Sequence, residues 1–384
     1  MKVRRFDAYK SRKARNRCFF ARWVSGLIIF VVSFLVLMIS HMSQNFATWY
    51  ATYVYPVLPR TLGWFFGLFP FSVFEAVLIL LCVTVPVMII FTVVRLFTVH
   101  GRAKLKAGVK IALPCLFNTL AIIFMLFVLA AGINYNRQTY ADHIGITVRD
   151  SSPDELVQLY LLLVERAEVL VTQIETDESG HFALRWDGMH DYASRAMREL
   201  DSMYGALGTY FPRAKAPILS RAALSNFNIG GFFSPWTMEA HYNGDMPGQS
   251  IPFVIAHELA HVAGHMREDE ANFIAYLASR NSVNVDFQYS AAYVALSYTL
   301  TPLRQAVGAD RYSELFSLLP EQVRRDFAAA RAYWQSFQGP AADFATRVND
   351  TYLRLNQQED GVRSYGRMVD LLLAYYREQG KILY

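Results

Sequence analysis

Residues 257–261 read His-Glu-Leu-Ala-His, and no other stretch of the 384 residues indicates as much about the chain. On a helix, residues four apart lie on one face, so His257 and His261 would present two imidazoles to one metal ion. This spacing suits Zn²⁺, with Glu258 beside them as the general base. The apolar run at 252–256 would bury the back of the helix. The alternative is an amphipathic helix with two surface histidines.

A second helix is predicted directly after the first. Gly264 and His265 suit a turn, and the acidic run at 268–270 suits a first helical turn, where the helix dipole favours negative charge. A catalytic zinc site takes three protein ligands and keeps one position for water. His257 and His261 would supply two ligands, and a carboxylate of the second helix is the natural third.

The sequence Glu268-Asp-Glu-Ala-Asn272 resembles the E-x-x-[AS]-[DN] motif of the gluzincin metallopeptidases. The resemblance implies that Glu268 is the third zinc ligand and that Asn272 orients a ligating histidine. Those peptidases usually carry Asp where this chain carries Asn272, so the orienting hydrogen bond would be neutral. The string is also similar to the motif of ImmA-type metalloproteases, and Glu270 is the alternative ligand.

Three apolar stretches in the first third of the chain are long enough to cross a bilayer, which takes about 20 residues. They cover about 23–40, 74–97 and 111–133. A cleaved signal peptide is not expected, because the first stretch is long and two more spans follow it. We therefore expect a basic N-terminus at 1–22, a membrane domain at 23–134 and a further domain at 135–384.

Lys and Arg predict the orientation of the spans. Nine cations lie in the first 22 residues and four at 102–110, whereas the loop between the first two spans has only Arg60. Because cytoplasmic loops are rich in Lys and Arg, the N-terminus and the 98–110 loop are expected in the cytoplasm. The domain at 135–384 is then extracytoplasmic, and the protein is placed in the cytoplasmic membrane.

The segment 50–72 complicates this count, because it is aromatic and apolar but interrupted by prolines, glycines and Arg60. We interpret it as an interfacial loop whose Trp and Tyr side chains lie near the lipid headgroups. If it crossed the membrane, the domain at 135–384 would lie in the cytoplasm.

Charge and cysteine usage exclude several classes of function. The net charge of the whole chain is +5, but from residue 135 onward 22 Lys and Arg stand against 30 Asp and Glu, a balance of −8. Such a domain offers nucleic acid no basic surface. Cys18, Cys82 and Cys115 all precede it, so it holds no disulfide, cysteine nucleophile or cysteine zinc ligand.

The domain at 135–384 is predicted to be mostly helical. Ser152-Pro153-Asp-Glu155 is a capping-box start. Further helical patterns cover 191–207, 287–306, 320–336, 341–357 and 366–379. The glycines and alternating aromatics of 229–243 predict a strand or hairpin, and 218–221 is a short strand candidate. In zinc peptidases such an edge strand pairs with the substrate backbone; a structural hairpin is the alternative.

The order of these elements resembles a family of largely uncharacterised bacterial membrane proteins. It comprises three N-terminal spans, the glycine-aromatic segment, the two zinc motifs and a late Ser364-Tyr365-Gly366. The resemblance covers nearly the whole chain and implies a gluzincin-like fold without an established substrate. The expected fold class has two parts. The first is an α-helical membrane anchor of three transmembrane helices, and the second is a mostly helical α+β domain with a gluzincin-like zincin fold.

The expected activity is zinc-dependent hydrolysis of peptide bonds in envelope or extracytoplasmic proteins. Zn²⁺ would acidify a water, Glu258 would act as general base, and Tyr365 is the first candidate for stabilising the oxyanion. His241, Tyr242 and His265 are further candidates for that role. The expected partners are the lipid bilayer and a peptide or protein substrate, with no nucleic acid.

Two other classes of protein remain open. An inactive descendant would serve as a membrane sensor or scaffold, although the complete set of His257, Glu258 and His261 argues against it. An intramembrane protease of the site-2 type would carry its motif in a spanning helix. Only about a dozen mostly apolar residues surround this motif and the charged run 267–270 follows, which is too short and too charged for a span.

Overall fold

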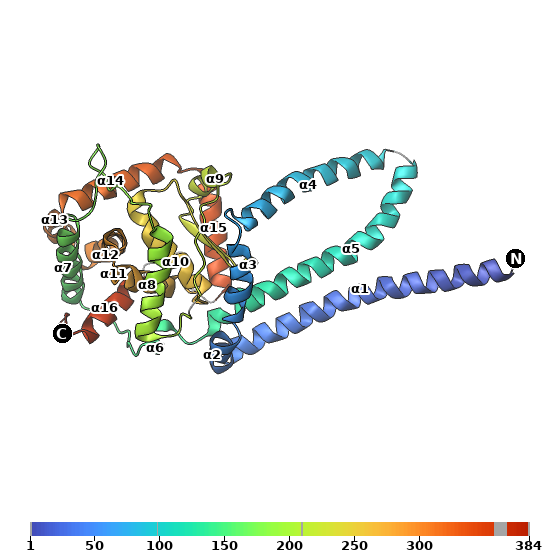
Figure 1. Cartoon of the computed structure of the whole chain (residues 1–384), viewed down its shortest axis with the longest axis horizontal. Coiled ribbons are helices and arrows are strands. Elements are labelled where there is room, and N and C mark those ends of the chain that lie inside the picture. The colour runs from blue at the N-terminus through green and yellow to red at the C-terminus, as the bar shows by residue number, and fades with distance from the viewer. Residues whose placement is uncertain (1, 98, 209, 357–366, 383–384) are drawn as a thin grey trace.

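The computed structural model describes residues 2–97, 99–208, 210–356 and 367–382. Over these residues the chain is mostly helical and contains one two-stranded sheet. Figure 1 shows a compact helical body at one end, from which three long helices project in the same direction. The predicted combination of a helical anchor and a mostly helical domain is therefore observed.

The three long helices are α1 (Lys2–Met42), α4 (Val73–Leu96) and α5 (Val99–Phe127), and α5 continues through the turns η2 (Val128–Gly132) and η3 (Ile133–Asn136). Their apolar stretches cover Phe19–Met42, Val73–Leu96 and Gly108–Asn136, close to the three predicted spans. Their length and their largely exposed apolar side chains indicate a membrane protein.

The segment between α1 and α4 is helical and folds back on the domain, which differs from the predicted interfacial loop. It forms α2 (Gln44–Tyr53), the π-helical turn η1 (Pro59–Gly63) and α3 (Trp64–Gly67). Trp64 is exposed as expected, but Tyr55 is buried and donates a hydrogen bond to the carbonyl oxygen of Val262 at 3.0 Å. Proline and glycine break this segment into short helices, which lets it follow the surface of the domain.

The domain contains the remaining helices and both strands. In chain order these are α6 (Tyr140–His143), α7 (Pro153–Leu170), α8 (Met189–Tyr204), α9 (Arg221–Asn226), β1 (Gly231–Ser234), β2 (Glu239–Tyr242), η4 (Gly248–Ser250), α10 (Ile251–Val262), α11 (Glu268–Arg280), α12 (Val285–Val307), α13 (Ala309–Ser317), α14 (Glu321–Ser336), α15 (Pro340–Leu355) and α16 (Met368–Glu378). The predicted helices are present, including the capping box at Ser152 and Glu155, and α6, α9 and α13 are additions.

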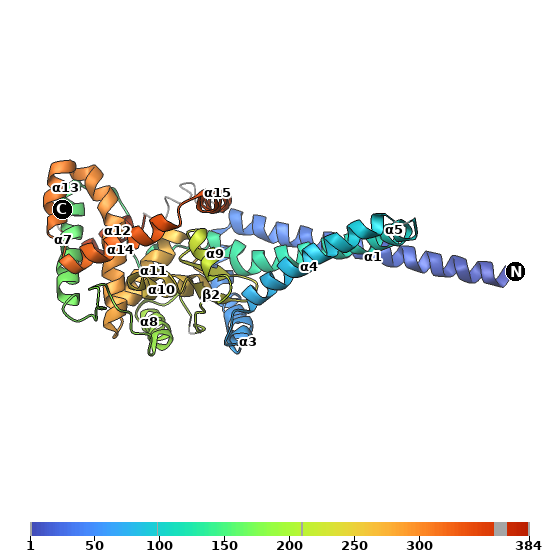
Figure 2. The ribbon, with the colours of Figure 1, turned by 90° about the horizontal axis from the view of Figure 1, so that it is seen from above.

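Helices α10 and α11, which carry the two predicted metal-binding motifs, form the centre of the domain (Figure 2). Every residue of α10 except Val254 is buried, and so is every residue of α11 except Arg280. Helices α8, α12 and α16 pack around them. The backbones of both motifs are therefore fixed by the packing of the hydrophobic core.

The predicted hairpin is present as the antiparallel pair β1 and β2, with Gly231 opposite Tyr242. The predicted strand at 218–221 is wrong. The backbone N–H groups of Ile218, Leu219 and Ser220 instead donate to the carboxylate of Glu75, at 2.7–3.0 Å. A side chain of the second long helix thus takes the hydrogen bonds that a strand partner would have accepted.

Candidate metal centre

His257, His261 and Glu268 come together at the contact between α10 and α11. Their ligand atoms all lie within 4.8 Å of one another. The histidines are one turn apart on α10, and Glu268 is the first residue of α11. Gly264 has a φ of +88° and makes the sharp turn that folds α11 back on α10. The sequence spacing and this one turn are enough to assemble the cluster.

The distances within the cluster fit a tetrahedral metal ion. The Oε2 atom of Glu268 lies 3.2 Å from Nε2 of His257 and 3.6 Å from Nε2 of His261. Zinc ligands at about 2.1 Å from the ion lie about 3.4 Å apart. Among the described residues, no fourth His, Cys, Asp or Glu joins the cluster. Three protein donors with an open fourth position are typical of a catalytic zinc site rather than a structural one.

The charges of the cluster also favour a cation. Burial alone would raise the pKa of Glu268, but the adjacent His261 and His257 hold it well below its usual range. Burial alone would lower the pKa of His261, and the Glu268 carboxylate raises it to about 9. The carboxylate is thus ionised although it is buried, because the two imidazoles stabilise its negative charge.

The two histidines are supported differently. The Nδ1 atom of His261 lies 2.7 Å from the carbonyl oxygen of His265, so Nδ1–H donates there and Nε2 faces Glu268. The Nδ1 atom of His257 has no hydrogen-bond partner among the described residues. Burial lowers the pKa of His257, and Glu268 and, to a smaller extent, Asn272 oppose that shift. Asn272 therefore lies near His257, as the gluzincin resemblance implies, without a hydrogen bond to its Nδ1 atom.

Glu258 is buried beside the cluster but is not part of it. Burial raises its pKa to about 8, and its Oε2 atom has no hydrogen-bond partner among the described residues. Strand β1 passes directly over it: a Cβ atom on Gly231 would lie 2.6 Å from its Oε1 atom and 2.8 Å from the carbonyl oxygen of His241. Only glycine leaves the Glu258 carboxylate room at this point.

A cleft of about 1440 Å³ opens onto these residues. His257, Glu258, His261 and Glu268 line one side, and residues of β1, α12, α14 and α15 line the others. Pockets for small molecules usually measure about 300–1,000 Å³. This cleft is larger than that range and suits a polymeric ligand.

One edge of β1 is available to such a ligand, because no described strand pairs with it. On the other side of β2, the backbone N–H of Lys215 donates to the carbonyl oxygen of Ala240, and the N–H of Tyr242 donates to the carbonyl oxygen of Lys215. The Ala240 carbonyl and the Tyr242 N–H therefore point away from β1. In an antiparallel pair the residues opposite them, Phe233 and Gly231, also turn their backbone groups outward. Two residues of β1 thus offer main-chain donors and acceptors to an extended peptide.

Of the remaining predicted site residues, those that the structure describes do not meet at the cluster. Tyr365 lies outside the described residues. His241 and Tyr242 are buried on β2 and do not line the cleft, and the His241 imidazole is 2.7 Å from the Ser72 hydroxyl. The His265 ring faces the carbonyl oxygen of Ala206 at 3.2 Å.

Glu270, the alternative third ligand, faces away from the two histidines. Its Oε1 atom accepts the N–H of Tyr140 at 3.0 Å, and its Oε2 atom lies 3.7 Å from Nδ1 of His265. Between the two acidic residues, the geometry therefore selects Glu268 for the cluster.

Tyr298 of α12 is a site residue that the sequence did not reveal. It lines the cleft, and burial together with the nearby Glu268 raises its pKa to about 12 while Asn272 lowers it. The helical spacing of Val294, Ser297 and Tyr298 could have placed them on one face, and all three line the cleft. The pattern does not say which face of α12 meets the metal cluster.

Comparisons with known proteins identify a family but no function. A family model described as "Protein of unknown function (DUF3810)" matches residues 50–373. No curated protein and no solved structure matches the chain. What the site does must therefore be inferred from its own residues.

Proposed function

The chain belongs to the DUF3810 family of proteins of unknown function, and we propose that it is a membrane-anchored, zinc-dependent peptidase of the gluzincin type. The observation that carries the proposal is a three-donor cluster with an open position, next to a buried carboxylate and a large cleft. Its substrates are extracytoplasmic proteins or peptides of the cell envelope.

The chain's own residues suit peptide hydrolysis. Zinc held by His257, His261 and Glu268 would supply a Lewis acid that polarises the scissile carbonyl and acidifies the attacking water. Glu258, which is buried beside the cluster and lines the same cleft, accepts the proton of that water and passes it to the leaving amine. The Tyr298 hydroxyl, beside Glu268, is the candidate among the described residues for donating to the oxyanion.

The outward-facing backbone groups of Gly231 and Phe233 support a peptide rather than a small amide as substrate. A peptide added to this edge would form main-chain hydrogen bonds along β1 and cross the face of Glu258. Affinity would come from the backbone, and specificity would come from the side-chain pockets of the cleft.

The contacts of the segment at 44–67 support an extracytoplasmic site. This segment lies between the first two spans, yet it packs against the domain that follows the third span. With three spans, segment and domain share one side of the membrane, and the N-terminus and the α4–α5 loop share the other. The cations of that second side mark it as cytoplasmic.

Metal analysis of the full-length protein in detergent tests the metal site. We expect about one zinc per chain in the wild type, loss of zinc in His257→Ala and Glu268→Gln, and retention in the matched control Glu270→Gln. Stoichiometric zinc in both His257→Ala and Glu268→Gln would show that the site is assigned wrongly.

Peptide cleavage by the zinc-loaded protein tests the chemistry. Glu258→Gln should keep its zinc and lose about 10²- to 10⁴-fold in rate, the usual contribution of a general acid–base. If the wild type holds zinc but cleaves no member of a peptide library, the protein is a zinc-binding sensor or scaffold instead.

A further inference from the structure

The zinc cleft has one wall made by a membrane helix. Ala131 and Tyr135, in the last turns of the third span, line the same cleft as the metal cluster. The Tyr135 hydroxyl lies 3.0 Å from the hydroxyl of Tyr352 on α15, and the Tyr352 ring contacts Phe127 edge-on at 6.5 Å. The cleft therefore lies against the membrane anchor and not on the far side of the domain.

Strand β1 leads from the metal cluster toward the spans. Gly231 at its start passes over Glu258, and its end leads into the turn at Trp236. The indole N–H of Trp236 donates to the carbonyl oxygen of Ile123 at 3.3 Å, and its ring stacks on Phe74 at 6.0 Å. Ile123 and Phe74 both belong to apolar spanning stretches. A peptide that pairs with β1 is thus directed into the bilayer at one end.

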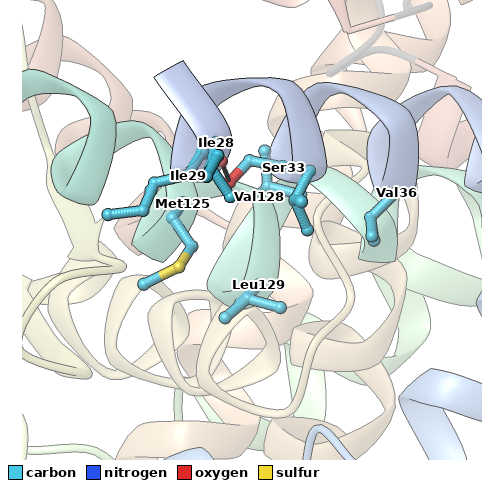
Figure 3. Close-up of a pocket in the computed structure, with 8 residues that line it drawn as sticks. Ile28, Ile29, Ser33, Val36, Met125, Val128 and Leu129 are labelled. Atoms are coloured by element: carbon cyan, nitrogen blue, oxygen red, sulfur yellow. Dashed lines mark hydrogen bonds between the residues drawn. The ribbon is translucent and has the colours of Figure 1, made fainter. Parts of the chain in front are cut away.

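An apolar groove lies between α1 and α5 (Figure 3). It measures about 250 Å³, and its lining includes Ile28, Val32, Val36, Met125, Val128 and Leu129. Val128 lines this groove, and Ala131, three residues further along the same helix, lines the zinc cleft. The groove lies within the spanning stretches, about one helical turn from the cleft along this helix, so a helix seated in it points toward the metal cluster.

Helix α15 adds an exposed apolar surface at the mouth of the cleft. Phe344 and Val348, one turn apart, are 59% and 52% exposed and line the cleft. In the two views α15 lies beside the ends of α1 and α5 that meet the domain (Figures 1 and 2). Apolar side chains exposed beside a membrane suit contact with lipid or with an apolar ligand better than contact with water.

We infer that the substrate is a polypeptide anchored in the same membrane by an apolar helix and cut just outside that helix. The inference rests on the proposed peptidase function and names its substrate class. The substrate helix packs into the groove between α1 and α5 through close van der Waals contact. The residues after it follow the four residues of β1, about 13 Å, to Glu258.

The chemistry is that of simple hydrolysis. Water adds to the carbonyl carbon, the C–N bond breaks, and the amine leaves with the proton that Glu258 delivers. One product stays in the membrane and the other is released outside it.

The test uses the full-length protein in phosphatidylethanolamine–phosphatidylglycerol vesicles with two forms of one probe. The anchored probe has a 20-residue Leu/Ala helix, a randomised 12-residue segment and a reporter domain. The soluble probe lacks the helix. Mass spectrometry of the new ends gives the cleavage rate and position. We expect the anchored probe to be cut on the order of 100-fold faster, within a few residues of its helix.

Sharing a membrane raises the local concentration of any anchored probe, so two variants isolate the groove. Val32→Trp fills the groove, and Leu27→Trp adds the same indole at a position outside the residues that line it; both native side chains are 53% exposed. We expect Val32→Trp to lower the ratio of anchored to soluble cleavage about tenfold and Leu27→Trp to leave it unchanged.

The outcomes separate this inference from the proposed function. Equal rates for both probes, or a Val32→Trp ratio equal to that of Leu27→Trp, overturn the membrane-anchored substrate and leave the peptidase intact. Equal ratios in Val32→Trp and Leu27→Trp would mean that lipid chains, not a substrate helix, occupy the groove. If the zinc-loaded wild type cuts neither probe, the peptidase function itself fails.

Discussion

Two junctions join the domain to its membrane helices, and they are built in opposite ways. The polar junction, at the start of α4, consists of Ser72, Glu75, Lys215, Glu239 and His241, which are all buried. The apolar junction, at the end of α5, consists of Phe127, Ala131, Tyr135 and Tyr352 and borders the open cleft. The polar junction holds the hairpin of β1 and β2 against α4, whereas the apolar junction leaves space for a ligand.

The polar junction is closed because its charges are paired and hydrogen-bonded. The Glu239 carboxylate accepts the backbone N–H groups of Val73 and Phe74 at 3.0 and 2.9 Å, and so caps α4. The Lys215 ammonium donates to Glu239 at 2.6 Å and to the carbonyl oxygens of Phe66 and Phe71. A buried ion pair with this many partners holds one geometry, and it is costly to break from one side.

The largest effect is expected from breaking this pair at Lys215. Lys215→Met leaves the Glu239 carboxylate buried without its cation, which should cost about 3–5 kcal/mol. Thermal unfolding of the full-length protein in detergent should then show a midpoint lower by about 10 °C. Hydrogen exchange should rise in β2 and at the start of α4, where the pair is anchored.

The double variant Lys215→Met/Glu239→Gln provides the control, because it removes both charges and keeps an acceptor for the α4 N–H groups. It should be more stable than Lys215→Met by at least about 1 kcal/mol. If Lys215→Met lowers the free energy of unfolding by less than about 1 kcal/mol, the polar junction does not fix the hairpin. The contrast between the two junctions then fails.

The polar junction also marks the limit of what the sequence could predict. The metal cluster follows from local spacing: a four-residue interval on one helix and a carboxylate at the start of the next. The polar junction depends on pairs such as Glu75 with Ser220, 145 residues apart. Such contacts leave no periodic pattern, so the 218–221 segment appeared to be a strand and Tyr55 appeared to face lipid headgroups.

The apolar junction was beyond prediction for a different reason. The spans were predictable from hydropathy, and the helix at Tyr352 was predictable from its period. Hydropathy does not say that the last turns of a span form the wall of a cleft. Tyr298 shows the same limit, because a helical pattern gives the faces of α12 but not the neighbour that each face meets.

Acidification should weaken the polar junction through His241. Burial lowers its pKa to about 4, Lys215 acts in the same direction, and Glu239 and Glu75 oppose them. An unfolded histidine titrates near 6.5. Between these values the unfolded chain binds a proton that the folded chain does not, so the free energy of unfolding falls as the pH falls, by up to about 3 kcal/mol.

The measurement is the unfolding midpoint between pH 7 and pH 4.5. His241→Gln should show a shallower pH dependence than the wild type, and the exposed-site control His143→Gln should match the wild type. If the unfolding midpoint changes equally with pH in His241→Gln and in the wild type, protonation of His241 does not weaken the polar junction in this range.

Gly231 connects the polar junction to the chemistry, because β1 passes over Glu258. In Gly231→Ala the new Cβ would lie 2.6–2.8 Å from Glu258, Val254 and the carbonyl oxygen of His241. Either strand β1 or the Glu258 carboxylate must therefore move. A displacement of about 1 Å can cost about 100-fold in rate, and we expect a loss of that size with zinc retained. Gly230→Ala is the matched control, since its nearest contact is 3.5 Å and its rate should stay near that of the wild type.

The smallest effect is expected at the apolar junction itself. Tyr352→Phe removes the hydroxyl that meets Tyr135 and leaves the ring contact with Phe127 in place. One such hydrogen bond contributes about 1 kcal/mol, so the unfolding midpoint should fall by only about 2–4 °C. A decrease as large as that of Lys215→Met would mean that this wall is as fixed as the polar junction. A cleft with two fixed walls could not widen to admit the chain segment that follows a substrate helix, whereas a cleft with one wall held by a hydroxyl pair and ring packing can.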